Sequence, residues 1–405
     1  MIESVQAAVD PTQTSEALVQ RVAAYGLRRT QAAMKEHDLP AALLFDADNI
    51  RYLTGTAVMR AWTLHGMDRF LLVPADGSPV LWEYPSVRTA EDPRRLHELR
   101  SAPSWSVFDV GTRSARRAAE FVGELIATLR SLGIEDDRIG IDRTDAYGFL
   151  ALQAAGLSVQ PAQFSLESAR SIKSAEEIEL IRRSLAVCDA AVAHLYENLR
   201  PGMTELEAWS LFSAHAFING AEYVECRLLS SGPRTNPWFQ EATARRIGPG
   251  DVVSFDTDLV GPSGYLADVS RAYLTGDVRS TERQRRLYGD AEEFLQNILD
   301  ELRPGADTAD LGRSLCKKFP AKYHAQRYPF IAHSAGLSDE FPTIVFDNHD
   351  TGVTVQPGMV FCIEAYVGEV GDAEGMKLEE QVLITDAGPE VLSKAPHDTR
   401  LAQRS

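Results

Sequence analysis

The sequence predicts an α+β protein of two domains, an α/β N-terminal domain over residues 1–165 and a second, strand-rich domain over residues 166–405. Three observations lead to this prediction. Short apolar strands alternate with amphipathic helices in the first part of the chain, which is the α/β pattern. The second part is rich in strands, with helices before and between them. Single acidic residues also stand inside the apolar strands of this second part, which indicates a functional site.

The N-terminal domain is expected to contain helices that alternate with short strands. Apolar residues recur at helical spacing from Leu18 to Met34, and Asp76 and Gly77 form a hairpin signal between two apolar segments. A turn is expected after the first strand, at residues 46–49. In chain order, the expected elements are helix 16–36, strands 41–45, 70–73 and 80–82, helix 115–132 and strand 138–142.

The second domain is expected to begin with two capped helices. Ser174, followed three residues later by Glu177, is a capping box, and Thr204 starts a second helix of the same kind. Beyond Gly220 the chain becomes rich in strands. The expected strands are 223–229, 252–259, 265–273, 359–367 and 377–385, and the expected helices 281–302 and 307–325 interrupt them.

The composition excludes several classes of protein. The 405 residues include 58 acidic and 41 basic ones, and the net charge of −17 disfavours nucleic-acid and anionic-membrane binding. The chain opens without a signal-peptide pattern and has no apolar segment of about 18 residues, so we expect no transmembrane helix. Its four cysteines lie far apart without zinc-site spacing, which fits a reducing cytoplasm. We therefore expect a cytoplasmic enzyme.

Three aspartates indicate a cation site. Asp256 and Asp258 are two residues apart, so in a regular strand both carboxylates project from one face. Hairpin pairing with the next strand would bring Asp268 beside them. Carboxylates crowded in this way repel one another unless a cation neutralises them. The alternative is a solvated strand edge with exposed acids, but the apolar flanks favour the cation site.

Further candidate ligands follow along the chain. Glu364 comes after five apolar residues, and Glu379 and Glu380 precede another apolar run, where alternation does not decide which of the two faces inward. His333 follows an apolar pair and precedes a glycine-containing loop; alone it would more often be a structural residue. Together with the strand acids it predicts an oxygen-rich site with one imidazole, suited to Mn, Fe, Co or Zn. The number of carboxylates suggests two ions.

This ordered set of Asp, Asp, His, Glu and Glu resembles the pita-bread metallopeptidase superfamily, which includes methionine aminopeptidase, prolidase, Xaa-Pro aminopeptidase and the metal-free creatinase. Residues 48–55 look like the creatinase/prolidase N-domain signature, and residues 356–364 and 377–385 look like the strands that carry the last two ligands. The resemblance implies a pita-bread catalytic domain behind a creatinase-like α/β N-terminal domain. It also selects Glu379 over Glu380.

Two departures from the peptidases of that superfamily stand out. The peptidases space their first two Asp ligands by 11 residues, whereas Asp256 and Asp258 precede Asp268 by 12 and 10 residues. The peptidases also carry a second histidine seven residues after the ligand histidine, and here that position is Glu340, next to Asp339. A peptide-cleaving site would therefore lack its usual proton-transfer partner.

In both departures the chain resembles one branch of the superfamily, the DddP-type dimethylsulfoniopropionate lyases. Segment 227–241, the spacing of Tyr328, His333 and Asp339, and the context of Trp62 and His65 are similar to that branch as well. The resemblance implies proton abstraction at Cα and β-elimination to dimethyl sulfide and acrylate. Asp339 is then the base, and Tyr328 orients the substrate or assists the proton transfer.

The resemblance also implies the ligands and partners. Two divalent ions, iron first with Mn, Zn or Co as alternatives, would be held by Asp256, Asp258, Asp268, His333, Glu364 and Glu379. The resemblance suggests substrate contacts by Trp62, Arg234, Trp238 and Tyr366. The alternative is that the aromatic side chains only pack in the core and that Arg234 only supports a turn. A homodimer that acts on a small zwitterionic substrate is expected, without nucleic-acid or membrane partners.

Two other functions stay open from the sequence. An Xaa-Pro dipeptidase or aminopeptidase-like metallohydrolase, acting on a small amide, is supported by the ligand set, and the missing second histidine counts against it. A metal-free, creatinase-like enzyme or binding module is the third hypothesis, and retention of every ligand position counts against that one.

Overall fold

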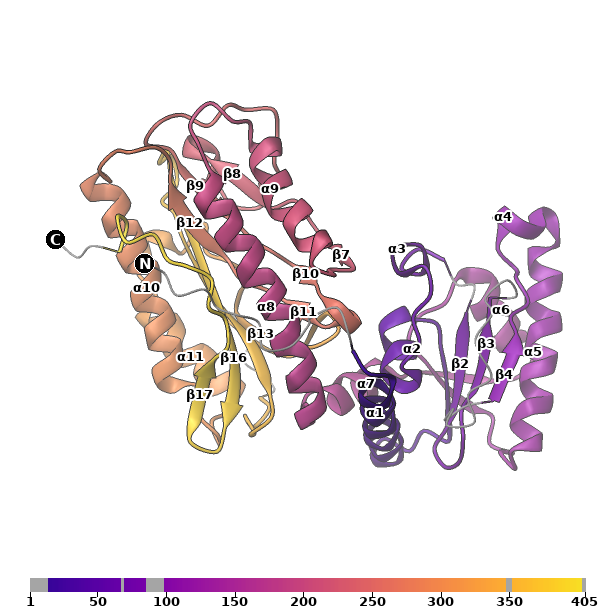
Figure 1. Cartoon of the computed structure of the whole chain (residues 1–405). Helices are drawn as coiled ribbons and strands as arrows, with labels where there is room; N and C mark the ends of the chain where they lie inside the picture. The colour runs from indigo at the N-terminus through magenta and orange to yellow at the C-terminus, as the bar shows by residue number, and fades with distance from the viewer. Residues whose placement is uncertain (1–13, 67–68, 85–97, 347–351, 403–405) are drawn as a thin grey trace. The chain divides into compact units, whose positions relative to one another are not determined.

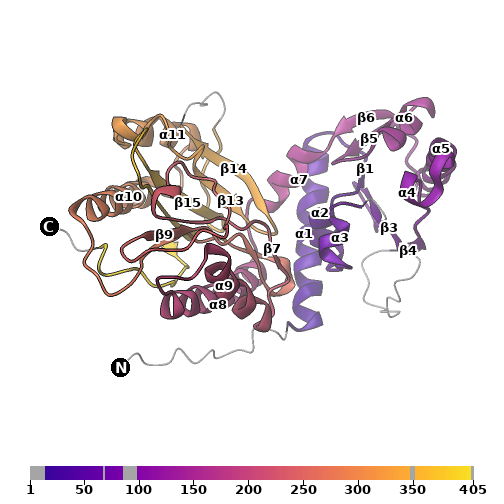
Figure 2. The ribbon, with the colours of Figure 1, turned by 90° about the horizontal axis from the view of Figure 1, so that it is seen from above.

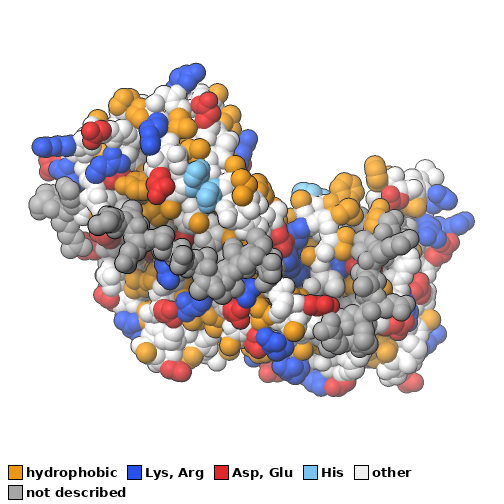
Figure 3. All heavy atoms as spheres, viewed as in Figure 1, with side chains coloured by type: hydrophobic (Ala, Val, Ile, Leu, Met, Phe, Trp, Pro, Cys, Tyr) orange, Lys and Arg blue, Asp and Glu red, His pale blue; other side chains and the backbone are white. Residues whose placement is uncertain are grey.

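The computed structural model describes residues 14–66, 69–84, 98–346 and 352–402. These residues form two compact units, one over Ser15–Arg170 and one that starts at Ser171 and includes Thr14 (Figure 1). Within the described ranges, no helix is both long enough and apolar enough to cross a membrane. On the face seen in Figure 3, acidic and basic side chains are interspersed rather than gathered in one patch.

The N-terminal unit is built on a mixed sheet, which has six strands among the described residues, in the order β4-β3-β2-β1-β5-β6. The strands are β1 (Ala41–Leu44), β2 (Phe70–Pro74), β3 (Val80–Glu83), β4 (Glu98–Ser101), β5 (Arg138–Ile141) and β6 (Ser158–Pro161). The helices are α1 (Glu16–Glu36), α2 (Ala47–Thr54), α3 (Arg60–Thr63), α4 (Val107–Val110), α5 (Ser114–Ser131), α6 (Ala146–Ala154) and α7 (Gln163–Arg170). The sheet lies between α1 and α5 (Figures 1 and 2).

Most of the expected N-terminal elements are present, and one expectation was wrong. The hairpin turns at Gly77, whose φ of +100° suits glycine, and pairs Phe70 with Trp82. The segment expected as a turn at 46–49 instead starts α2. Asp46 caps this helix by accepting hydrogen bonds from the backbone N–H groups of Asp48 and Asn49. Asp-rich segments favour turns and helix N-caps alike, so the sequence pattern did not separate the two.

The second unit contains sheets enclosed by two helix pairs. Its helices are α8 (Ala175–Asn198), α9 (Glu205–Ile218), α10 (Glu282–Glu301) and α11 (Thr308–Lys318). Its strands are β7 (Tyr223–Val224), β8 (Leu229–Ser231), β9 (Val252–Phe255), β10 (Leu259–Val260), β11 (Leu266–Ala267), β12 (Arg271–Leu274), β13 (Phe330–Ala335), β14 (Asp339–Val345), β15 (Val360–Val367), β16 (Met376–Thr385) and β17 (Gly388–Val391). In both ribbon views the strands lie between α8–α9 and α10–α11 (Figures 1 and 2).

The longest sheet of this unit presents one face to a hydrophobic core. Over the described residues its strand order is β14-β13-β15-β16-β17. Alternate residues of β15, such as Phe361 and Ile363, pack with Phe294 of α10 and Leu315 of α11. The intervening residues of β15 therefore face the other way, and Glu364 is one of them.

Several expected strands are broken, and the breaks matter for the site. The segment expected as one strand over 252–259 forms β9 and β10, because residues 256–258 leave the extended conformation and Asp258 has a φ of +36°. The segment 265–273 is likewise split into β11 and β12, with Asp268 in the interruption. The expectation that Asp256 and Asp258 share one face of a regular strand was therefore wrong. Both expected capping boxes, at Ser174 and Thr204, are present.

Candidate metal centre and active site

The candidate metal ligands come from strands and strand breaks of the second unit. Asp256 directly follows β9, and Asp268 directly follows β11. His333 lies on β13, whereas Glu364 on β15 pairs directly with Glu379 on β16. Because residues two apart in a strand share a face, sheet register brings the histidine and both glutamates to the side opposite the α10–α11 core.

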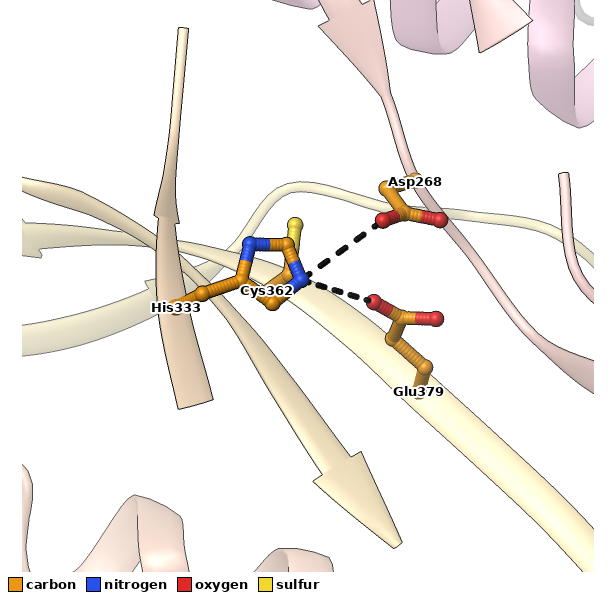
Figure 4. Close-up of side chains that lie close together, drawn as sticks. All are labelled: Asp268, His333, Cys362 and Glu379. Atoms are coloured by element: carbon orange, nitrogen blue, oxygen red, sulfur yellow. Dashed lines mark ion pairs between the residues drawn. The ribbon is translucent and has the colours of Figure 1, made fainter. Parts of the chain in front are cut away.

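The side chains of this cluster lie within metal-binding reach of one another. His333 Nε2 is 3.7 Å from Asp268 Oδ2 and 4.0 Å from Glu379 Oε1 (Figure 4). It is also 3.4 Å from Glu364 Oε1. The donor atoms fall into two groups whose members all lie within 4.8 Å of one another. One group is Asp268, His333, Cys362 and Glu379, and the other is Asp256, Asp258 and Asp268. Asp268 belongs to both groups.

Asp258 reaches the cluster in spite of the broken strand. Its positive φ turns the backbone so that its carboxylate still lies with those of Asp256 and Asp268. The thiol of Cys226 donates a hydrogen bond to Asp258 Oδ2. Burial, and then the charge of Asp256, raise the pKa of Asp258 to about 8. The carboxylate is therefore held in place but lacks a balancing positive charge.

The residues fit divalent cations. Asp268 Oδ1 and Glu379 Oε1 are buried and form no hydrogen bond within the described part of the chain. Burial raises the pKa of Asp268 and of Glu379 well above their usual range, and neighbouring carboxylates act in the same direction. Buried acids with unmet acceptors are costly unless a cation is present, and one imidazole among carboxylates is a common ligand set for transition metals.

Lys377 is a member of this site that the sequence reasoning missed. Its Nζ is 3.1 Å from Asp256 Oδ2 and 3.2 Å from Glu379 Oε2, and it also pairs with Glu364. The side chain is 0% exposed. Lys377 lies two residues before Glu379 on β16, so a lysine on the same strand face as a ligand was the available signal. Five ligand carboxylates exceed this one cation by four charges, which two divalent ions would balance.

Asp339 and Glu340 are adjacent but do different things. Asp339 Oδ1 is 3.4 Å from His333 Nδ1, and 60% of the Asp339 side chain is exposed. Glu340 is buried and accepts from Lys173 Nζ at 2.9 Å and from the backbone N–H of Leu337 at 3.1 Å. Glu340 therefore has a structural role, and Asp339 is the carboxylate of the pair that substrate can reach.

Several neighbours of Asp339 act on the pKa of its carboxyl group. Desolvation of its carboxyl raises the pKa of Asp339; His333 opposes this effect, and Glu364 and Asp256 add to it.

Tyr328 lies beside the cluster and its ring contacts a cation and an aromatic side chain. Its ring centroid is 4.4 Å from Lys377 Nζ, and its ring stacks on Phe239 with centroids 5.4 Å apart. Burial, and then the charge of Glu364, raise the pKa of Tyr328 above its usual range. The hydroxyl of Tyr328 therefore keeps its proton at neutral pH.

The residues expected to contact the substrate differ in burial and in their partners. Trp238 is buried beside the cluster, 5.7 Å from Lys377 Nζ, and its Nε1 has no hydrogen-bond partner among the described residues. The hydroxyl of Tyr366 lies 3.0 Å from Thr235 O and 2.9 Å from Asn236 Oδ1, so its one proton is shared between these acceptors and the side chain supports a loop. Arg234 forms an ion pair with Glu205, which fits the alternative that Arg234 supports a turn rather than contacts a substrate.

Trp62 belongs to the N-terminal unit. It is 50% exposed on α3 and lines a cavity of about 540 Å³ together with Tyr84, Trp105, Phe108 and Tyr147. The ring centroids of Trp62 and Phe108 are 6.5 Å apart, in an edge-to-face arrangement. Substrate contact by Trp62 stays a prediction.

Comparison with known proteins identifies the family. Residues 179–386 match metallopeptidase family M24, and residues 27–172 match the creatinase/prolidase N-terminal domain. Over 398 residues the chain is 33% identical to dimethylsulfoniopropionate lyase DddP of Roseovarius nubinhibens, covering 95% of this chain and 89% of the relative. It is 34% identical over 369 residues to dimethylsulfoniopropionate lyase DddP of Roseobacter denitrificans, covering 89% and 82%. The chain belongs to the DddP family of M24 proteins.

Solved structures agree with the fold expected for the DddP family. An Xaa-Pro dipeptidase from Bacillus anthracis superimposes with a TM-score of 0.74 at 20% identity, covering 93% of this chain and 99% of the other. A prolidase from Pyrococcus horikoshii gives 0.72 at 20% identity, covering 92% and 99%. The predicted family and the predicted pita-bread fold with a creatinase-like N-terminal domain are thus confirmed, and this DddP-family chain is an enzyme. M24 enzymes are dinuclear, in keeping with two donor groups that share Asp268.

Proposed function

We propose that this enzyme cleaves dimethylsulfoniopropionate to dimethyl sulfide and acrylate. The observation that carries the proposal is the pair of adjacent acids after His333. Asp339 lies beside the imidazole and is open to solvent, whereas the position where the peptidases place a second histidine is the buried, ion-paired Glu340. The site therefore offers a carboxylate base where peptide hydrolysis needs an imidazole. The names of the two DddP relatives support the same reaction.

The reaction is a β-elimination in which this chain moves one proton. Asp339 takes the proton from Cα of the substrate, the electron pair forms the Cα–Cβ double bond, and the Cβ–S bond breaks to release dimethyl sulfide. Two divalent ions held by the cluster would bind the substrate carboxylate and supply positive charge opposite the charge that develops as the proton leaves. The hydroxyl of Tyr328 orients that carboxylate.

Aromatic side chains near the cluster would hold the sulfonium. Trp238 lies beside the cluster and packs on Tyr366 with ring centroids 5.8 Å apart. An onium cation gains about 0.5–2 kcal/mol from an aromatic face. Lys377 Nζ lies closer to the ring centroid of Tyr328, at 4.4 Å, than to that of Trp238, at 5.7 Å, so Trp238 is the better candidate for this contact.

The cofactor and the state of the enzyme are part of the proposal. We infer that the ions are iron, as the resemblance to the DddP branch implies, with Mn, Zn or Co as alternatives; mainly oxygen donors with one imidazole suit all four metals. We also propose a cytoplasmic homodimer that acts on a small zwitterionic substrate and has no nucleic-acid or membrane partner.

The test of the reaction is the release of dimethyl sulfide. Purified full-length chain loaded with Fe²⁺ is incubated with dimethylsulfoniopropionate, and dimethyl sulfide is measured in the headspace. Asp339→Asn should lower the rate by about 100-fold or more, because it removes the base and keeps the shape of the side chain. Asp386→Asn, at an exposed acid after β16, is the matched control and should keep full activity. Hydrolysis of proline dipeptides without dimethyl sulfide would instead identify a peptidase.

A further inference from the structure

Cys362 lies among the side chains of the cluster, although the expected ligand set does not include it. It sits on β15 two residues before Glu364, so the two side chains share the strand face that carries the ligands. Across the sheet, Cys362 pairs with His333 of β13. The thiol thus lies on the polar face of the sheet rather than on the α10–α11 core.

The surroundings of Cys362 are metal donors. Its Sγ lies within 4.8 Å of donor atoms of Asp268, His333 and Glu379, and all four residues are buried (Figure 4). A tetrahedral ion holds such donors about 3.5 Å apart. The spacings of 3.7 Å and 4.0 Å from His333 Nε2 to the two carboxylates already approach that value. Two buried oxygens of this set, on Asp268 and Glu379, have no hydrogen bond in the described chain.

The other donor group includes no cysteine, and the thiol beside it, on Cys226, donates its proton in a hydrogen bond to Asp258. Asp256, Asp258 and Asp268 offer only carboxylate oxygens. The two groups therefore differ in chemical character, one a nitrogen, sulfur and oxygen set and the other an oxygen set, joined by Asp268. Thiolate ligands favour Zn²⁺, Co²⁺ and Fe²⁺, whereas oxygen-only positions suit Mn²⁺ and Mg²⁺ as well.

We propose that Cys362 is a sulfur ligand of one of the two ions and makes the centre chemically asymmetric. The inference rests on the proposed dinuclear site and adds a ligand to it. When sulfur binds, the thiol proton passes to solvent and no oxidant or reductant is needed. The position with Cys362 then selects softer ions, and the position with Asp256 and Asp258 accepts harder ones.

Spectroscopy tests the sulfur ligand without relying on activity. Full-length chain loaded with Co²⁺ should show a thiolate-to-cobalt charge-transfer band in the near ultraviolet, and Cys362→Ser should lose it. Cys316→Ser is the matched control and should keep the band, since Cys316 packs against the hydrophobic core. In competition experiments, Cys362→Ser should lose about tenfold or more of the preference for Zn²⁺ over Mn²⁺.

X-ray absorption of the Zn²⁺-loaded wild-type chain keeps the proposal testable if the variants do not fold. A sulfur scatterer at about 2.3 Å is expected. Zinc bound with oxygen and nitrogen neighbours alone, or identical cobalt spectra for wild type and Cys362→Ser, would mean that Cys362 only packs. Dimethyl sulfide release, measured on the Fe²⁺-loaded chain, separates the two proposals: sulfur ligation without lyase activity contradicts the function alone. A chain that binds neither metal contradicts both.

Discussion

Lys377 brings a fixed positive charge into a cluster of carboxylates that otherwise repel one another. It touches three of them, Asp256, Glu364 and Glu379, from a fully buried position. A buried ion pair contributes little net stability compared with apolar packing, but removing one partner leaves an uncompensated charge. Lys377 should therefore contribute most to stability when no metal ion is bound at the site.

We predict that Lys377→Met destabilises the chain by about 3–5 kcal/mol in the presence of a chelator. Metal should recover part of this loss, because divalent ions replace the missing positive charge. Lys377→Arg keeps the positive charge, so its free energy of unfolding should fall clearly less than that of Lys377→Met. Chemical denaturation with and without Zn²⁺ measures the difference, and equal losses for the two variants would argue against a charge effect.

At the scale of elements, the start of α8 places an ionisable group in the interior. Glu177 closes the capping box at Ser174 and accepts a hydrogen bond from Tyr265 at 3.2 Å. Burial raises its pKa to about 7. The capping geometry needs an acceptor at this position, but burial disfavours a charged one. The helix start is therefore sensitive to pH.

We predict that Glu177 makes stability fall as pH rises. Because its folded pKa is raised above the value of 4.5 for an unfolded glutamate, its contribution is complete below pH 4.5 and is lost as pH rises towards 7. At pH 8, Glu177→Gln should be more stable than wild type by up to about 3 kcal/mol. At pH 4.5 the two should be nearly equal. Urea denaturation at both pH values gives the comparison, and a constant difference would contradict it.

The elements also show what sequence can and cannot predict. The capping boxes and the strands of Glu364 and Glu379 follow local rules of spacing and were predictable. The break at residues 256–258 was not, because the positive φ of Asp258 depends on what surrounds it. Glu340 likewise looked equivalent to Asp339, and a contact with Lys173, far away in sequence, separates their roles. Long-range pairing decided these cases, and a single sequence does not display it.

At the scale of the whole molecule, the chain divides into two units with separate hydrophobic cores. Phe70, Trp82 and Phe121 belong to the N-terminal core, whereas Phe294 and Phe361 belong to the core of the second unit. The candidate ligands all lie in the second unit. Units with their own cores can unfold separately.

We predict that metal removal destabilises one unit selectively. With metal bound, calorimetry of the full chain should show a transition for the second unit that a chelator shifts to lower temperature, because the buried carboxylates lose their counter-charge. The midpoint temperature of the N-terminal unit should not change beyond experimental error. An equal shift of both transitions would indicate that the units unfold together.

The pleat of β14 has a consequence for how substitutions act on the base. Asp339 and Glu340 are consecutive, so the strand turns one towards substrate and the other into the ion pair with Lys173. Fixing Glu340 also fixes the peptide unit that Asp339 shares with it. Changes at Lys173 should therefore reach the reacting carboxylate through the backbone, without any contact between the two side chains. A residue that never meets the substrate thus helps to set the position of the proton acceptor.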